Sequence, residues 1–191
     1  PSIHGFDGMG DLFECALSGL PISTYSVWLE NFEPQNVDIA SLGPATLVPK
    51  VVKHLGSSNC NVLLMGHLIK SVPNFKGEEF NFVLDIPNFE WCLKNTDCVV
   101  ATLDTCRADT FNLAGKFAKG DSIFAKLLNT SIQFAQARHL DNAFVYDYIA
   151  VRYFVNKEFN TECVVDKRGN AFNQLIPKSS IDLLDISKHR T

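Results

Sequence analysis

Residues 143–156 read AFVYDYIAVRYFVN, and this stretch decides how the whole sequence is interpreted. One face of an extended chain would carry Ala143, Val145, Ile149, Val151, Tyr153 and Val155, and the other would carry Phe144, Tyr146, Tyr148 and Phe154. Aromatic and β-branched residues favour extended structure, and two apolar faces are typical of a strand that is covered on both sides. The stretch therefore predicts a central β-strand flanked by other strands.

Working outward from this strand, the sequence predicts a β-rich α+β fold. Further strands are expected over 22–29, 61–72, 80–86, 97–104, 131–139 and 161–165, and helices over 12–18, 45–55, 110–119, 122–129 and after Ser179. The elements follow one another without regular β–α–β alternation, which favours a mostly antiparallel or mixed sheet with a few short helices packed on it. No repeat or linker interrupts the chain, so residues 1–191 are expected to form a single globular domain.

The composition argues against some classes of partner. The formal net charge is −4, from 17 basic and 21 acidic residues. An acidic chain with scattered basic residues lacks the attraction to phosphates on which nucleic-acid binding depends, which argues against nucleic acid as a partner. Every apolar run is shorter than the roughly 18 residues of a membrane-spanning helix, so no transmembrane segment is expected.

Cysteine usage indicates a reducing compartment. Six cysteines stand at positions 15, 60, 92, 98, 106 and 163, most of them in apolar surroundings. No secretory leader is recognisable, and free cysteine behaves as a small hydrophobic residue. We therefore expect reduced thiols and a cytoplasmic or otherwise intracellular protein.

A thiol nucleophile is the first catalytic possibility. Such a site needs a cysteine near a helix N-terminus and a histidine within reach. Cys15 lies near the start of the expected helix over 12–18, and His139 is followed by Asp141, which could orient its ring. With six cysteines and five histidines, chance pairings are frequent, and a core thiol is the favoured interpretation.

Other site chemistry has weaker support. No CxxC or HxxxH pair exists, so no metal is expected, although folding could gather Cys60, His54 and His67. No glycine-rich phosphate loop follows a strand, so no cofactor is expected. Several acidic residues outside helices could pair in space to form a carboxylate site, but solvated carboxylates and helix caps are the simpler interpretation. These residues are Glu78, Glu79, Asp85, Asp104 and Asp109.

Two stretches resemble viral proteins in the order of their elements. Leu47–Val72 followed by Phe80–Ile86 resembles the core of plant-virus movement proteins, in which a helix, an apolar strand and a second strand end in an aspartate, here Asp85. Phe80–Gln133 resembles rhabdovirus matrix proteins, with an acidic loop at Asp104–Asp109. Either resemblance implies a role in viral assembly.

The leading functional expectation is a non-enzymatic structural or protein-interaction domain that binds a protein partner or itself. Aromatic residues are enriched at interfaces, and the chain has 15 phenylalanines. Phe75 and Phe89 each follow a Pro-Asn turn, so they are expected to be exposed at such an interface. The alternatives are a cysteine-dependent hydrolase that uses Cys15 and His139, and a small-ligand-binding domain with an aromatic pocket.

Overall fold

The computed structural model describes residues 36–137, 141–156 and 159–177, together with Leu184. The chain divides into two compact units. We call the described residues of 36–108 and 146–177 the sheet unit, and those of 109–145 the helical unit. That residues 1–191 form a single domain stays a prediction.

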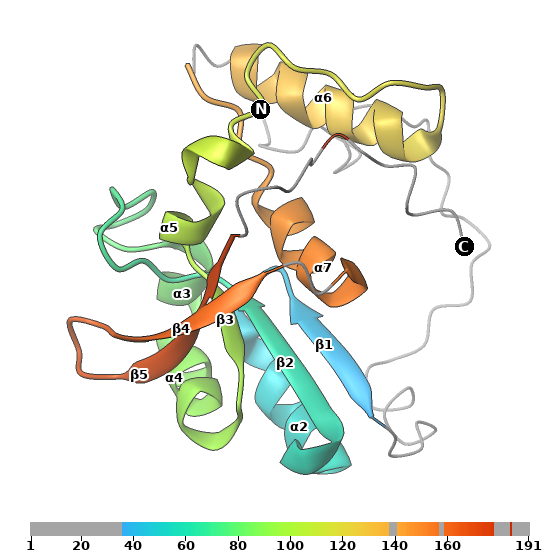
Figure 1. Cartoon of the computed structure of the whole chain (residues 1–191). Coiled ribbons are helices and arrows are strands. Elements are labelled where there is room, and N and C mark those ends of the chain that lie inside the picture. Colours follow the sequence, from blue (N-terminus) through green and yellow to red (C-terminus); the bar gives the residue numbers. More distant parts are fainter. Residues whose placement is uncertain (1–35, 138–140, 157–158, 178–183, 185–191) are drawn as a thin grey trace. The chain divides into compact units, whose positions relative to one another are not determined.

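The sheet unit holds a five-stranded mixed sheet in the order β1-β2-β3-β5-β4 (Figure 1). Its strands are β1 (Val37–Ser41), β2 (Cys60–Met65), β3 (Val99–Ala101), β4 (Asn160–Val165) and β5 (Ala171–Ile176). The first three strands and β5 run parallel, whereas β4 pairs antiparallel with β5. The expected α+β class with a mixed sheet is therefore confirmed, and the carboxyl ends of four strands meet at one edge.

Short helices connect the strands. The sheet unit contains η1 (Ala45–Leu47), α2 (Val48–Leu55), η2 (Ser57–Asn59), α3 (Phe80–Leu84), α4 (Ile86–Asn95), α5 (Leu103–Cys106) and α7 (Tyr146–Asn156). The helical unit contains η3 (Asp109–Phe111) and α6 (Ile123–Ala137). The helix expected over 45–55 is confirmed by η1 and α2. It ends at Gly56, which has a φ of 86°, a backbone conformation that glycine adopts without steric cost.

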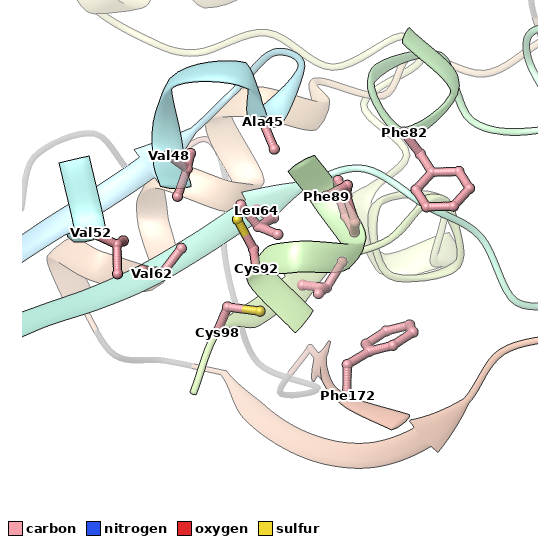
Figure 2. Close-up of a cluster of buried hydrophobic side chains, with 11 residues drawn as sticks. Ala45, Val48, Val52, Val62, Leu64, Phe82, Phe89, Cys92, Cys98 and Phe172 are labelled. Atoms are coloured by element: carbon pink, nitrogen blue, oxygen red, sulfur yellow. The ribbon is translucent and has the colours of Figure 1, made fainter. Parts of the chain in front are cut away.

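The core lies on both faces of β2. Val62 and Leu64 point to one face, where they join a cluster of buried side chains from α2, α3, α4, β3 and β5 (Figure 2). Leu63 points to the other face, because side chains alternate along a strand, and it is fully buried. Helix α7 packs against β1 and β2. The strand therefore needs apolar residues at successive positions, as its sequence provides.

The predicted central strand over 143–156 is wrong, because this stretch forms α7. Ile149, Ala150 and Arg152 are buried along the helix, whereas Asp147 and Val151, four residues apart, are exposed on the opposite side. Apolar residues at most positions satisfy a helical period as well as a strand period, so alternation alone does not separate the two.

The strands expected over 80–86 and 131–139 are also wrong. Residues 80–84 form α3, which begins after the capping residue Glu79, and residues 131–137 are the last turns of α6. A capping side chain and tertiary packing outweigh the β-propensity of a few phenylalanines here. The helix expected over 110–119 is replaced by the short η3 and a loop, whose Ala118 is hydrogen-bonded to the Asn129 side chain.

Two strands were missed and other expectations lie outside the described residues. β1 falls in a stretch interpreted as turns, and β5 contains the polar pair Asn173 and Gln174. The strand expected over 161–165 is confirmed by β4. The elements expected over 12–18, over 22–29 and after Ser179 lie outside the described residues.

The exposed positions predicted for two phenylalanines are not both found. Phe89 is 1% exposed and belongs to the core cluster, so its expected surface position is wrong. It follows Pro87 into α4, where proline is tolerated in the first turn, and the helix directs its ring inward. Phe75 is half-buried, with its ring packed edge-on against Phe80 at 5.1 Å between centroids.

The five cysteines within the described residues are free thiols. Burial raises the pKa of Cys92 to about 12 and that of Cys98 to about 11, and it also raises the pKa of Cys106. These three thiols are therefore poor nucleophiles at neutral pH. In the part of the chain that the structure describes, no helix combines the length and apolar character needed to cross a membrane.

A pair of substitutions in α7 distinguishes a helix from a strand at this position. A strand would place Ile149 and Val151 on the same face, whereas the helix buries Ile149 and leaves Val151 36% exposed. We expect Ile149→Asp to lower the free energy of unfolding by roughly 3 kcal/mol or more, because it buries an unpaired charge, and Val151→Asp to change it by less than about 1 kcal/mol. Urea denaturation followed by circular dichroism measures both. Equal losses for the two variants would contradict the helix.

Candidate functional site

The carboxyl edge of the parallel strands is where open α/β sheets place their ligands. Asn81 lies at this edge, in the first turn of α3. Its amide nitrogen donates to the carbonyl oxygen of Met65 at 3.1 Å and to that of Leu42 at 3.4 Å. The Asn81 side chain thereby joins the ends of β1 and β2. Within the described residues, its side-chain oxygen has no hydrogen-bond partner.

Glu79 fastens the end of β2 to α3. One of its carboxylate oxygens, Oε2, accepts the backbone N–H of Phe82 at 2.9 Å and that of His67 at 3.1 Å. The side chain is buried, and burial raises the pKa of Glu79 while the N–H donors oppose that shift. Gly66 lies so close that a Cβ there would be 2.9 Å from the Phe89 ring and 3.0 Å from Glu79 Oε2. Only glycine fits this approach.

Buried polar residues also join β3 to β5. The Gln174 amide donates to Thr102 Oγ1 at 2.8 Å, and the Thr105 hydroxyl donates to the carbonyl oxygen of Leu175. Asp104 fixes the loop after β2, because its carboxylate accepts three successive backbone N–H groups, those of residues 69–71, at 2.7–2.8 Å. The backbone around the carboxyl edge is therefore held by side-chain hydrogen bonds as well as by the backbone hydrogen bonds between strands.

His67 is a fully buried histidine directly after β2. Its Nε2 atom is 2.9 Å from Asp166 Oδ2, and its ring is stacked on Phe82 at 4.2 Å between centroids. Within the described residues, Nδ1 has no hydrogen-bond partner. Burial lowers the pKa of His67, so the ring is neutral at pH 7.

Asp166 is held as a carboxylate. Burial alone would raise its pKa, but hydrogen bonds from His67, from the Asn170 side chain and from backbone N–H groups lower it below the ordinary value. A carboxylate acceptor on Nε2 places the ring proton there and leaves Nδ1 as an unprotonated acceptor.

The carboxylates considered from sequence are structural where the structure describes them. Glu78 contacts Lys167 at 2.6 Å and Arg168 at 3.5 Å, and Asp85 caps α4 through Asn88. Asp109 begins η3. Among the described residues, no three His, Cys, Asp or Glu side chains lie close enough to hold a metal ion.

The structure tests little of the expected thiol site. Cys15 and His139 lie outside the described residues, and Asp141 is exposed in the helical unit. Sequence reasoning missed Asn81, because a strand was expected over 80–86, and it considered His67 only as a scattered metal ligand. The Glu79 side chain caps α3 in the structure, but glutamate is not one of the usual N-cap residues, so the sequence carries no clear signal for this helix.

Comparison with known proteins gives a fold likeness. No family model matches the sequence, and no curated protein matches it significantly. The structure is similar to that of the inosine-uridine preferring nucleoside hydrolase from Bacillus anthracis, with a TM-score of 0.55 and 11% identity, covering 82% of this chain and 60% of that chain. A weaker likeness, with a TM-score of 0.49 and 9% identity, is to the effector protein XOO4466, covering 85% and 59% of the two chains.

These likenesses correct the functional expectation. This chain spans about three fifths of the hydrolase, and at 11% identity the likeness establishes the fold alone. The expectation of a non-enzymatic structural or interaction domain with a viral assembly role is corrected, because the fold likeness is to a nucleoside hydrolase and not to a viral structural protein. The alternative of a cysteine-dependent hydrolase that uses Cys15 and His139 stays a prediction, because both residues lie outside the described residues.

The buried imidazole predicts a loss of stability on mild acidification. Because burial lowers the pKa of His67 in the folded chain, the unfolded chain takes up this proton at a higher pH. The unfolded state then binds more protons as the pH falls below about 6.5, so the free energy of unfolding decreases.

Urea denaturation between about pH 8 and about pH 5.5 measures this effect. The decrease in the free energy of unfolding should be smaller in His67→Gln than in the wild type. The raised pKa of Glu79 acts in the opposite direction, but both proteins contain Glu79, so its contribution cancels when they are compared. His54→Gln, which replaces an exposed histidine of α2, is the matched control. An identical pH dependence in wild type and His67→Gln would refute the assignment.

Proposed function

We propose that this chain recognises a nucleoside at the carboxyl edge of β1 and β2, with the sugar at Asn81 and the base against Phe80. The single observation that carries the proposal is the side-chain oxygen of Asn81 at this edge, which has no hydrogen-bond partner among the residues that the structure describes, in a fold shared with a nucleoside hydrolase. Ligands of parallel sheets bind at this edge, because loops and helix starts converge there.

The polar groups of the edge match a sugar better than a charged ligand. Asn81 is fixed by the two hydrogen bonds that its amide nitrogen donates, so its oxygen has a defined direction. Ribose hydroxyl groups donate hydrogen bonds, and an amide oxygen accepts them. Glu79, two residues before Asn81, accepts backbone N–H groups and adds no cation or free donor for a phosphate, which is compatible with a neutral sugar.

An aromatic side chain lies next to this acceptor in the sequence and is accessible. Phe80 is 41% exposed and stands between Glu79 and Asn81. Its ring is supported edge-on by Phe75 at 5.1 Å, which limits its movement. Stacking of a base on an aromatic ring contributes about 1–3 kcal/mol in nucleic-acid complexes, so this ring is a suitable support for a nucleobase.

Recognition is the function that these residues support, and hydrolysis is a further step. The carboxylates of Glu79 and Asp104 accept backbone N–H groups, so both serve the backbone rather than a water molecule. We therefore assign nucleoside binding to this chain. The cytoplasmic setting and a protein partner stay predictions; the first is supported by the free, buried thiols of Cys92 and Cys98.

Calorimetric titration of the 191-residue chain with inosine and with uridine tests the proposal. Asn81→Leu retains the side-chain size but removes both the acceptor and the donor that joins β1 to β2. We expect it to weaken binding at least about tenfold, because a buried hydrogen-bonding group of the ligand is left unpaired.

Asn173→Leu is the matched control, because Asn173 is an exposed asparagine on β5. It should bind as the wild type does. Thermal melting verifies that both variants fold. The proposal fails if the wild type binds neither nucleoside, or if the two leucine variants bind equally well.

A further inference from the structure

We infer that His67 is a positioning residue that connects the turn of the β4–β5 hairpin, through Asp166, to Glu79 and thereby to the nucleoside site. This inference rests on the proposed function for its relation to ligand, but its structural part concerns hydrogen bonds within the chain alone. The connection joins segments that are 99 residues apart in the sequence.

The backbone of His67 holds two neighbouring elements. Its N–H donates to Glu79 Oε2 at 3.1 Å, and its carbonyl oxygen accepts the N–H of Leu103, the first residue of α5, at 3.0 Å. The residue that makes both bonds has a φ of 69°, in the left-handed region, which residues other than glycine occupy uncommonly although histidine, asparagine and aspartate are enriched there. Such a conformation persists only where surrounding contacts enforce it.

The side chain supplies those contacts. Nε2 is bonded to Asp166, whose carboxylate is itself fixed by the backbone N–H groups of Arg168 and Asn170, both at 2.8 Å. The imidazole therefore meets a rigid acceptor. Its ring also lies parallel to the ring of Phe82, with 4° between their planes.

Phe82 closes the connection at the other end. The N–H of this residue donates to the same oxygen of Glu79 that accepts the N–H of His67, and its ring carries the stacked imidazole. Glu79 Oε2 is thus positioned by two N–H groups from residues whose side chains pack against each other. Because Asn81 lies between Glu79 and Phe82 in the first turn of α3, a shift of His67 moves the proposed sugar-binding oxygen.

Three substitutions in the 191-residue chain test this inference. His67→Gly removes the imidazole at a φ that glycine tolerates. His67→Gln retains a donor that can reach Asp166. Cys92→Ala is the control for general destabilisation, because it alters a buried residue of the same core. The two measurements are inosine affinity by calorimetry and hydrogen exchange of the Phe82 amide by nuclear magnetic resonance.

We expect His67→Gly to bind inosine at least about tenfold more weakly and to exchange the Phe82 amide at least about tenfold faster than Cys92→Ala does, after correction for global stability. His67→Gln keeps a donor for Asp166 but loses the ring that stacks on Phe82, so both measurements should lie between those of His67→Gly and the wild type. If His67→Gly does not fold, His67→Asn replaces it, since asparagine tolerates the left-handed region but is too short to reach Asp166.

The inference is overturned if the glycine or asparagine variant matches Cys92→Ala in both measurements, which would leave His67 as a filler of the core. If the wild type binds no nucleoside, the proposed function fails, and the exchange of the Phe82 amide alone decides whether His67 positions Glu79.

Discussion

The paired hydrogen bonds to Glu79 Oε2 are the constraint on which the sheet unit depends at the carboxyl edge of its parallel strands. They fasten the residue after β2 to the start of α3, and they require a backbone approach at Gly66 that no larger residue allows. A buried carboxylate is costly unless it is hydrogen-bonded, so this arrangement is stable only in one geometry. That geometry fixes where Asn81 lies, because Asn81 follows Glu79 by two residues.

Hydrogen-bond partners also distinguish the polar groups that hold the backbone at this edge from the group that is available to a ligand. Asp104 and Thr105 are occupied by backbone partners from other segments, as is Glu79. Asn81 is different, because its nitrogen is occupied whereas its oxygen has no partner within the described residues. An amide oxygen can accept a hydroxyl hydrogen but supplies no acid, base or nucleophile, so the proposed binding function agrees better with the geometry than a catalytic one does.

Sequence reasoning succeeded where a local signal has one physical interpretation. The helix over 45–55 has proline in its first turn and glycine after its last, and both signals hold in α2. It failed for α7, whose aromatic and β-branched residues fill most positions. In this stretch only tertiary packing decides which side is buried. The structure shows that Asp147 and Val151, four residues apart as on one side of a helix, are both exposed. The missed β1 and β5 are short strands whose neighbours in the sheet, not their own residues, make them strands.

Because a strand was expected over 80–86, both α3 and the candidate site at its start were missed. In a strand, Phe80, Phe82 and Leu84 share one face, and Glu79 is only a turn residue before it. In α3, Glu79 becomes the cap of the helix, and the Phe82 N–H is turned back onto its carboxylate. The helix also separates the phenylalanines, since Phe82 is buried against His67 while Phe80 remains 41% exposed.

The role of His67 was missed for a related reason. Its partner Asp166 is distant in the sequence, and a pairing across that distance follows from the sheet order rather than from any local pattern. The residues that carry the proposed function were therefore all present in the sequence, but their roles depend on a helix cap and a sheet order that local periodicity does not encode.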